Sequence, residues 1–240
     1  MEKLKEVLDN IIEKNKYKEM LDREEIDKIE DTYPFNKTEY VISFLMAKKI
    51  LSFEEYKKIR RDYIKRNKYL YLYEINAPRT FGETWAQSWL NKIVPELEKP
   101  NKKLDPNYKG EYDLWYKGIK IEVKASRAVK KEKGISLIKK AISSDSKSKF
   151  EMNFQQIKTN CCDVFVWIAV WTDKIEYWVL PNYDVINSQY YSNGQHRGNK
   201  GEGQLWIKDS NISEFNIFKT EEKDILNRII EKGKLAKQRK

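Results

Sequence analysis

Residues 112–126 read YDLWYKGIKIEVKAS. A β-hairpin over this segment would bring together two carboxylates, Asp113 and Glu122, and one of its lysines, Lys124. Lys117-Gly118 can form a two-residue turn, because glycine readily adopts the positive φ that tight hairpin turns need. With this turn, Asp113 falls opposite Glu122. Because side chains alternate between the two faces of a strand, Lys124 shares their face. A one-residue bulge, common near such turns, would shift this register.

Two neighbouring carboxylates and an amine can support metal-dependent hydrolysis. Carboxylate oxygens are preferred ligands of Mg²⁺, and a lysine beside them can orient or deprotonate a water molecule. The alternative is an amphipathic hairpin with one solvated face, on which a Glu–Lys pair is ordinary surface charge. The same Glu-x-Lys spacing recurs at Glu55 and Glu221, but there it lies in expected amphipathic helices without an aspartate on a preceding strand. The hairpin setting therefore favours the catalytic interpretation for Glu122.

The composition is that of a folded protein with a solvated surface. Of 240 residues, 35% are charged and 40% are hydrophobic, with 7 Trp, 15 Tyr and 9 Phe. These values are unlike a disordered chain and fit one large domain, or one domain with an appended subdomain. No run of 18 apolar residues is present, so no membrane span is expected, and the N-terminus is unlike a signal peptide. A disulfide between the adjacent Cys161 and Cys162 would be strained, which fits a reducing cytoplasm.

Positive charge is concentrated in one part of the chain. The formal net charge is +10, and residues 101–160 hold 15 Lys or Arg against 7 Asp or Glu. The last nine residues, KGKLAKQRK, add five more positive charges. Such a surface can simply be solvated, but clustered cations also bind polyanions, because they displace counterions from phosphates. Acidic ligands inside a basic field are what a site that cleaves phosphodiesters would need.

Residues 1–75 are expected to form an N-terminal helical subdomain. Apolar residues at helical spacing and capping-box pairs predict helices over residues 2–14, over 23–31, after Asn36 and after Ser52. Paired helices are compatible with a helix-turn-helix DNA reader, but the residues between the last two helices are not a diagnostic turn. Packing or dimerisation is therefore the favoured role of this subdomain.

Residues 76–240 are expected to form an α/β core. The expected elements are a helix around FGETWAQSW, the hairpin, a basic loop with a short helix over 127–149, a strand or a turn into a helix at KFEMNFQQIK, strands at DVFVWIAVW and KIEYWVL, a short helix after Pro181, a strand at QLWIK, an edge strand at 215–218 and a helix over 221–233. DVFVWIAVW is apolar throughout, which is typical of a central strand. The order indicates an α/β sandwich with one mixed sheet, followed by a C-terminal helix and a basic tail.

This pattern resembles the PD-(D/E)xK nuclease superfamily, and type II restriction endonucleases in particular. The family signature is an acidic residue on one strand and Glu-x-Lys on the next, after an N-terminal helix. It is matched here by Asp113 and by Glu122-Val123-Lys124, while Tyr112 stands where the family name has proline. The resemblance implies a restriction-endonuclease-like core, with a mixed central sheet flanked by helices. It also implies Mg²⁺, with Mn²⁺ as a substitute, held by Asp113, Glu122 and the carbonyl of Val123 beside Lys124.

Further positions follow from the resemblance, which covers roughly residues 80–210. Relatives often carry a carboxylate on the helix before the hairpin, and Glu83 occupies that position. Thr80 and Glu83 also form a capping-box pair, so a structural role for Glu83 is equally open. Many relatives carry a glutamine-bearing helix before an apolar strand. This points to Gln156 as a catalytic residue and to Gln155 as a DNA contact, although both could be surface amides.

The segment SQYYSNGQHRGNKGEG is the candidate DNA-reading loop. Arg, Asn and Gln can pair with base edges, and glycines let a loop approach a groove closely; a flexible solvated loop is the alternative. The candidate DNA contacts are Asn193, Gln195, His196, Arg197, Asn199 and Lys200 in this loop, and Arg127 and Lys130 after the hairpin. His196 is the only histidine, which argues against histidine-rich metal sites. The loop has no P-loop pattern, so no nucleotide cofactor is expected.

Together these features predict a cytoplasmic, Mg²⁺-dependent type II restriction endonuclease that acts on double-stranded DNA. Cleavage of both strands at a palindrome needs two active sites, so a homodimer is expected, and no membrane partner is expected. A structure-specific or repair nuclease of the same fold is the first alternative. A non-catalytic DNA-binding regulator, which would read DNA through residues 36–67, is the second.

Overall fold

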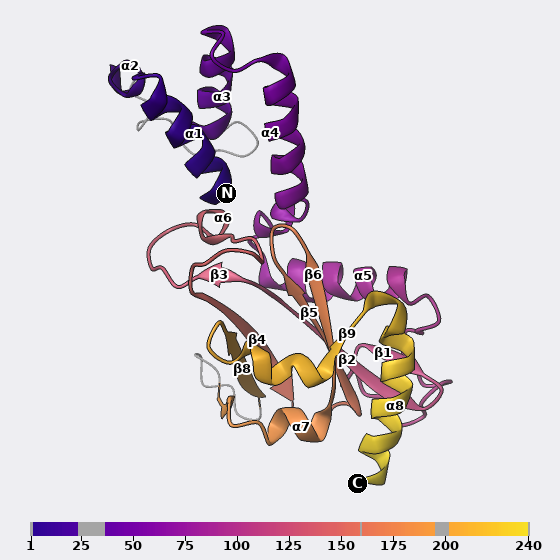
Figure 1. The fold of residues 1–240 in the computed structure, drawn as a ribbon. Coiled ribbons are helices and arrows are strands. Elements are labelled where there is room, and N and C mark those ends of the chain that lie inside the picture. Colours follow the sequence, from indigo (N-terminus) through magenta and orange to yellow (C-terminus); the bar gives the residue numbers. More distant parts are fainter. Residues whose placement is uncertain (1, 24–36, 159, 195–201, 240) are drawn as a thin grey trace. The chain divides into compact units, whose positions relative to one another are not determined.

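Apolar side chains at helical spacing give the first 68 residues a core of their own. The computed structural model describes residues 2–23, 37–158, 160–194 and 202–239, and the chain divides into two units, Met1–Lys68 and Tyr69–Lys240. The first unit contains helices α1 (Glu2–Lys14), α2 (Lys18–Arg23), α3 (Lys37–Ala47) and α4 (Phe53–Arg66) (Figure 1). Its buried apolar side chains are Leu8, Leu21, Val41, Ile42, Leu45 and Leu51.

The helices predicted over residues 2–14 and after Ser52 are confirmed. The Ser52 side chain accepts a hydrogen bond from the Glu55 N–H, and the Glu55 carboxylate accepts one from the Ser52 N–H at 2.9 Å, which completes the capping box. Helix α2 lies just before the predicted second helix, and all of that prediction after Arg23 falls outside the described residues. Residues 24–36, with the predicted cap at Asn36, lie outside the described residues.

The second unit begins earlier than the predicted boundary at residue 75. Its first element, η2 (Leu70–Tyr73), buries Leu70, Leu72 and Tyr73 in the core of this unit. The Tyr73 hydroxyl donates to the carbonyls of Ala128 and Val170 at 2.9 and 2.8 Å, respectively. These contacts place the boundary after Lys68.

The main sheet of the second unit is mixed, as predicted. Its strands are β1 (Leu114–Tyr116), β2 (Ile119–Arg127), β5 (Val164–Val170), β6 (Ile175–Pro181) and β9 (Lys219–Thr220), in the order β1-β2-β5-β6-β9. Strands β2 and β5 are parallel, whereas the other neighbours are antiparallel. Every residue of β5 is buried, which confirms it as the central strand.

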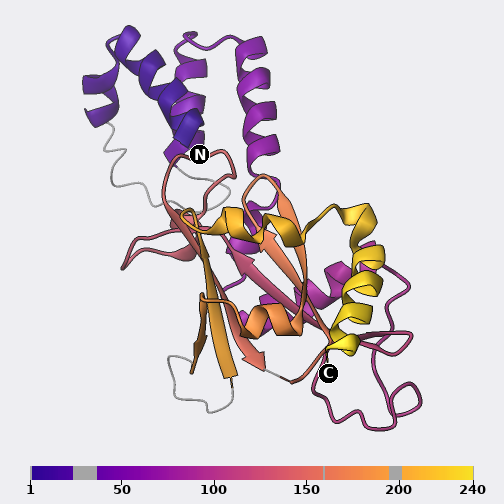
Figure 2. The ribbon, with the colours of Figure 1, turned by 60° about the horizontal axis from the view of Figure 1, so that its bottom comes forward.

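Helices cover one face of this sheet. The π-helical turn η3 (Thr80–Trp85) continues into α5 (Ala86–Ile93), and the C-terminal helix α8 (Ile225–Gln238) packs on the same face (Figure 2). Leu90 on α5 and Ile229 on α8 belong to the same buried cluster as Ile121 and Val123 on β2. The alternate residues of β2, which include Glu122 and Lys124, therefore point to the opposite face.

A second sheet packs against that opposite face. Its strands are β3 (Val129–Lys130), β4 (Phe150–Lys158), β8 (Glu202–Lys208) and β7 (Tyr191–Asn193), in the order β3-β4-β8-β7. Phe154 on β4 stacks on Trp167 of β5 with ring centroids 4.3 Å apart, and both are fully buried. The prediction of one sheet is therefore wrong. The segment KFEMNFQQIK is a strand and not the turn into a helix, because its apolar residues pack on the main sheet.

The remaining elements are short. The helix predicted after Pro181 is confirmed as α7 (Asn182–Ile186), and α6 (Leu137–Lys140) lies in the basic segment after the hairpin. The edge strand predicted at 215–218 is wrong: η4 (Ile212–Phe218) is a 3₁₀ helix that buries Phe215, and the edge strand is β9 directly after it. A second 3₁₀ turn, η5 (Glu222–Asp224), leads into α8. No described helix is both long and apolar enough to span a bilayer.

Candidate active site

The β1–β2 hairpin forms in the predicted register. Lys117 and Gly118 have φ values of 44° and 87°, as a tight two-residue hairpin turn requires, and Leu114 pairs with Ile121. Strand β1 begins at Leu114, so Asp113 lies one residue before it and donates its N–H to the Ile121 carbonyl at 3.0 Å. The turn and the alternation of side chains therefore bring Asp113 to the polar residues of β2.

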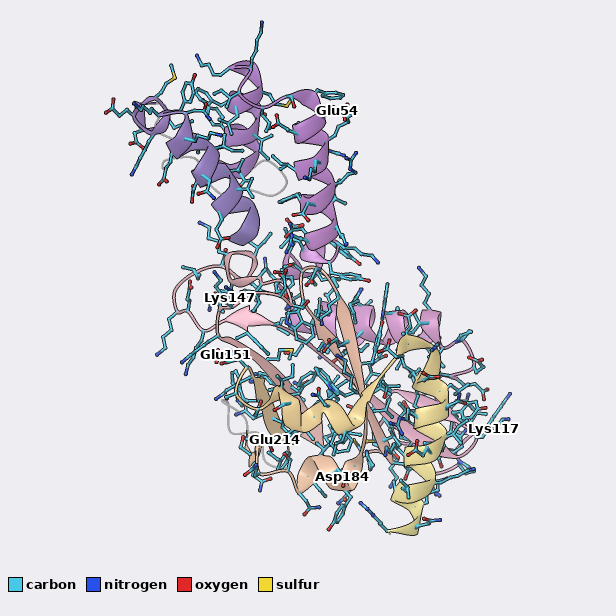
Figure 3. All side chains as sticks on the ribbon, viewed as in Figure 1. Glu54, Lys117, Lys147, Glu151, Asp184 and Glu214 are labelled. Atoms are coloured by element: carbon cyan, nitrogen blue, oxygen red, sulfur yellow. The ribbon has the colours of Figure 1, made fainter. Side chains whose placement is uncertain are left out.

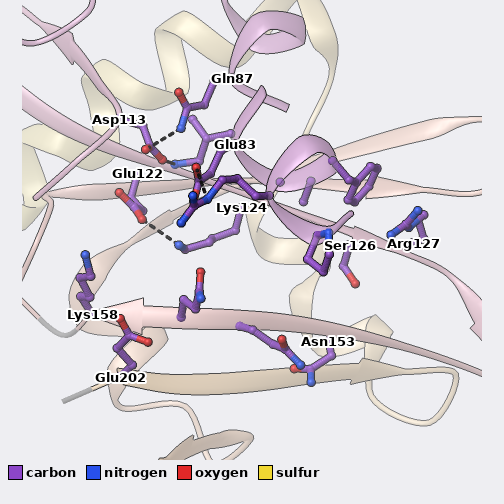
Figure 4. Close-up of a pocket in the computed structure, with 18 of the residues that line it drawn as sticks. Glu83, Gln87, Asp113, Glu122, Lys124, Ser126, Arg127, Asn153, Lys158 and Glu202 are labelled. Atoms are coloured by element: carbon purple, nitrogen blue, oxygen red, sulfur yellow. Dashed lines mark hydrogen bonds and ion pairs between the residues drawn. The ribbon is translucent and has the colours of Figure 1, made fainter. Parts of the chain in front are cut away.

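Both carboxylate oxygens of Asp113 accept hydrogen bonds. Oδ1 accepts from Gln87 Nε2 at 2.7 Å, and Oδ2 accepts from the Val123 N–H at 2.8 Å (Figure 4). The preceding residue, Tyr112, is buried and donates its hydroxyl to the Asp105 carboxylate at 2.9 Å. Contacts from helix α5, strand β2 and the loop before the hairpin thus fix the position of Asp113.

Glu122 and Lys124 form an ion pair inside the protein. The Lys124 Nζ lies 2.8 Å from the Glu122 Oε1, and their side chains are 16% and 8% exposed. An ordinary surface pair would be far more exposed than this, so the interpretation as solvated surface charge is wrong. Burial of a charged pair costs free energy of desolvation, which the attraction between the two charges only partly offsets.

The environment disfavours the ionised carboxylates. Burial raises the pKa of Asp113, and repulsion from Glu83 adds to the rise. The hydrogen bond from the Val123 N–H and the attraction of the Lys124 ammonium lower it, but by less. Burial also raises the pKa of Glu122 to about 7, against the attraction of Lys124 and Lys158. The pKa of Lys124 is raised, because attraction to the carboxylates outweighs its burial. A cation placed between the two carboxylates would relieve this strain.

A cleft of about 920 Å³ lies over these residues. The second sheet forms its opposite wall, where Figure 4 shows Lys158 and Glu202 on the side of Glu122 and Asn153 nearer to Ser126. A β-bulge interrupts the pairing of β4 with β8 between Phe154 and Ile157, and it places Gln155 and Gln156 along the cleft. The predicted glutamine-bearing helix is thus a bulged strand, although both amides line the cleft.

Glu83 also lines the cleft, on the π-helical turn η3. Glu83 does not form the predicted capping box with Thr80, because the chain is already helical at Arg79 and no side chain caps the turn. Glu83 instead pairs with Arg79, whose Nε lies 3.4 Å from Glu83 Oε2. Both side chains of this pair are more than half exposed, so Glu83 stays accessible to a ligand in the cleft.

The predicted DNA contacts are divided between several places. Arg127 reaches the cleft, but its guanidinium lies over the Phe81 ring and donates to the carbonyls of Leu72 and Ile75, both at 2.8 Å. Arg127 thus ties β2 to the start of the unit. Lys130 on β3 and Asn193 on β7 are not among the residues that line the cleft. The other predicted contacts, Gln195, His196, Arg197, Asn199 and Lys200, lie outside the described residues.

The donor set fits a hard divalent cation. Asp113 and Glu122 supply carboxylate oxygens, and an oxygen that accepts one hydrogen bond keeps a second lone pair for a metal ion. The N–H and C=O of one strand residue point to the same side, so the Val123 carbonyl faces the side on which its N–H meets Asp113. Within the described residues, no group of three or more acidic, histidine or cysteine side chains could hold a metal by itself. A carbonyl and water would have to complete the ligands.

No protein-family model matches this chain, and no curated protein matches it significantly.

Among the cleft residues that were not predicted from the sequence, Gln87 and Lys158 bear directly on the two carboxylates. Gln87 follows Glu83 by four residues on the same helix, and this spacing alone indicates a shared face. Lys158 is harder to predict from the sequence, because it lies near Glu122 only through packing of the second sheet on the main sheet. No ion pair joins Lys158 to a described carboxylate, so its ammonium is available to an anion in the cleft.

Proposed function

We propose that the second unit is a Mg²⁺-dependent endonuclease that hydrolyses phosphodiester bonds in double-stranded DNA, of the type II restriction kind. The observation that carries the proposal is the grouping of Asp113, Glu122 and Lys124 in a cleft with little exposure. Buried carboxylates with raised pKa values, next to a charged lysine, match a site for a cation and an attacking water.

Each residue has a distinct part in the proposed reaction. Asp113 and Glu122, with the Val123 carbonyl, would hold Mg²⁺ or Mn²⁺, which when bound offsets phosphate charge and makes water more acidic. The Lys124 ammonium orients the attacking water and offsets negative charge in the transition state. Lys158 faces the same place from the second sheet and binds a non-bridging phosphate oxygen.

The order of elements supports a restriction-endonuclease-like core. A helix precedes the β1–β2 hairpin, and an apolar central strand lies parallel to β2. The bulge on β4 presents Gln155 and Gln156 to the same cleft. In this proposal these amides and residues 193–200 contact the DNA.

A plasmid assay tests the proposal. Supercoiled plasmid and genomic DNA are incubated with the protein in Mg²⁺ or in EDTA. Discrete fragments in Mg²⁺ alone support a restriction endonuclease. A smear would instead indicate a nuclease without site preference, and a gel shift without cleavage would indicate a DNA-binding regulator.

The Lys124→Met variant assigns the activity to this cleft. Loss of the ammonium should lower the cleavage rate by about 100- to 1,000-fold, as for other transition-state donors, with DNA binding in EDTA little changed. Lys117→Met, in the exposed turn of the same hairpin, is the matched control and should cleave normally. Equal activity of the two variants would remove Lys124 from the proposed site.

A further inference from the structure

Helix α4 of the first unit carries a row of exposed cations. None of its residues is buried. Lys58, Arg61 and Lys65 are all exposed, and their spacings of three and four residues put them on one helical face. At 1.5 Å per residue the row is about 10 Å long. Figure 3 shows the side chains that project from this helix, with Glu54 labelled in its first turn.

The acidic residues of α4 do not neutralise this row. Glu54 pairs with Lys57 at 2.5 Å, Asp62 pairs with Arg66 at 2.8 Å, and Glu55 is used at the helix cap. Among the described residues, no carboxylate forms an ion pair with the three cations of the row. These cations therefore keep their full charge toward the solvent.

The charge is local to this helix. Residues 52–68 hold seven Lys or Arg against three Asp or Glu, whereas residues 1–51 hold ten against twelve. If basic residues were simply abundant on the surface of the first unit, residues 1–51 would also hold more Lys and Arg than Asp and Glu. The first unit is thus slightly acidic apart from one strongly basic helical face.

We propose that the row Lys58–Arg61–Lys65 is a phosphate-binding face for double-stranded DNA. The proposal deepens the proposed nuclease function, on which it rests, by giving the first unit a role in holding the substrate. Lys and Arg bind phosphates through charge and displace counterions, and such contacts hold a duplex without reading its sequence. The proposal assigns this row to phosphate contacts and leaves the residues that read bases unassigned.

The test compares two charge reversals of equal size in the full-length protein. One variant carries Lys58→Glu, Arg61→Glu and Lys65→Glu. The control carries Lys14→Glu, Lys18→Glu and Lys49→Glu, three exposed lysines of the same unit outside α4. Binding of a short fluorescent duplex is followed by anisotropy in EDTA over a series of salt concentrations, so that cleavage plays no part. Circular dichroism checks that both variants fold.

The α4 variant should bind at least about tenfold more weakly than the control, and the slope of log K against log salt should fall by about 3, one phosphate contact for each lost cation. If reversal unfolds the unit, the matching Gln substitutions replace it. Equal losses in both variants, an unchanged salt slope, or a wild-type protein that binds anionic vesicles but not the duplex would overturn the proposal. Binding through α4 without any cleavage in Mg²⁺ would support it and reject the nuclease function alone.

Discussion

Among single residues, Asp113 is held at both of its carboxylate oxygens. One of its carboxylate oxygens accepts from the Val123 backbone and the other from Gln87. Substitution of a side chain can remove only the second bond. Gln87 is therefore a positioning residue, which acts on a ligand through Asp113.

Gln87→Leu should weaken metal binding more than it weakens catalysis at saturating metal. The change keeps the size of the side chain but frees Asp113 to rotate, and loss of such supporting bonds typically costs about 10- to 100-fold in metal affinity or activity. Cleavage rates measured against Mg²⁺ concentration should show a shifted midpoint, with much of the rate recovered at high Mg²⁺. Ser88→Ala, the exposed neighbour on α5, is the control. A lower rate at every Mg²⁺ concentration with no shift in midpoint would count against positioning.

Glu122 determines the expected pH dependence of metal binding. Burial raises its pKa to about 7, so the carboxyl is protonated at a pH where an exposed glutamate is ionised. Protons compete with metal for this oxygen, and affinity for Mg²⁺ or Mn²⁺ should therefore rise as the pH increases through about 7 and then level off. Calorimetric titration with the metal ion at several pH values across this range measures the affinity directly.

Glu122→Gln should bind the ion weakly at every pH and lose this step. Glu132→Gln, an exposed glutamate in the basic segment after the hairpin, should keep it. A step at the same pH in both variants would assign the titration to another group.

At the scale of elements, the bulge in β4 combines strain with access to the cleft. Gln156 has a φ of 56°, in the left-handed region that costs an ordinary residue about 1 kcal/mol or more. The residue lines the cleft, so its conformation is compatible with a functional role for the amide. Strain and function can be separated here because glycine adopts the same backbone without the amide.

Gln156→Gly should raise stability by a few tenths to about 1 kcal/mol, the relief of strain less the greater entropy of unfolded glycine. The same variant should bind and cleave DNA less well if the amide contacts the substrate. Lys117→Gly is the matched control, because Lys117 has a φ of 44° but lies in the hairpin turn. Urea unfolding and cleavage rates give the two readouts. A more stable variant with unchanged cleavage would show that Gln156 does not contact DNA.

The same bulge explains which elements could be predicted. The hairpin depends on its own turn residues and on strict alternation, so its register is readable from 15 letters. In β4 the extra residue puts Phe154 and Ile157 on one buried face, although they are three residues apart. A spacing of three is typical of helices, and the pairing with β8 that overrides it comes from a distant segment.

The residues of the candidate active site also differ in how far the sequence predicts them. Asp113, Glu122 and Lys124 lie close in sequence and could be grouped from local geometry alone. Gln87 joins them from 26 residues before Asp113, and Lys158 joins them through packing between the sheets. Local pattern therefore predicts the centre of the cleft, whereas its walls depend on tertiary structure.

At the scale of the whole molecule, the division into a helical unit and an α/β unit follows the change in sequence pattern. The exact boundary between the two units cannot be read from this pattern, because Leu70, Leu72 and Tyr73 are apolar residues that either unit could bury. Contacts with the second unit decide the matter after folding. The basic face of α4 belongs to the first unit and the candidate active site to the second, so DNA binding and cleavage should respond separately to substitution.

Double-strand cleavage should require a dimer. The described residues of one chain provide one set of Asp113, Glu122 and Lys124, so a concerted cut through both strands of a palindrome needs two chains. Analytical ultracentrifugation with a cognate duplex should give a protein mass about twice 28.8 kDa. Wild-type protein should convert supercoiled plasmid to linear product with little nicked circle.

A mixture with excess Lys124→Met tests this arrangement. Exchange of subunits would form dimers with one functional site, and these can cut only one strand in each encounter, so nicked circles should accumulate. A mixture with Lys117→Met at the same ratio keeps two functional sites in every dimer and should still give linear product. If both mixtures yield the same proportion of nicked circles, the two strands are cut by independent chains, and the dimer is not required for cleavage.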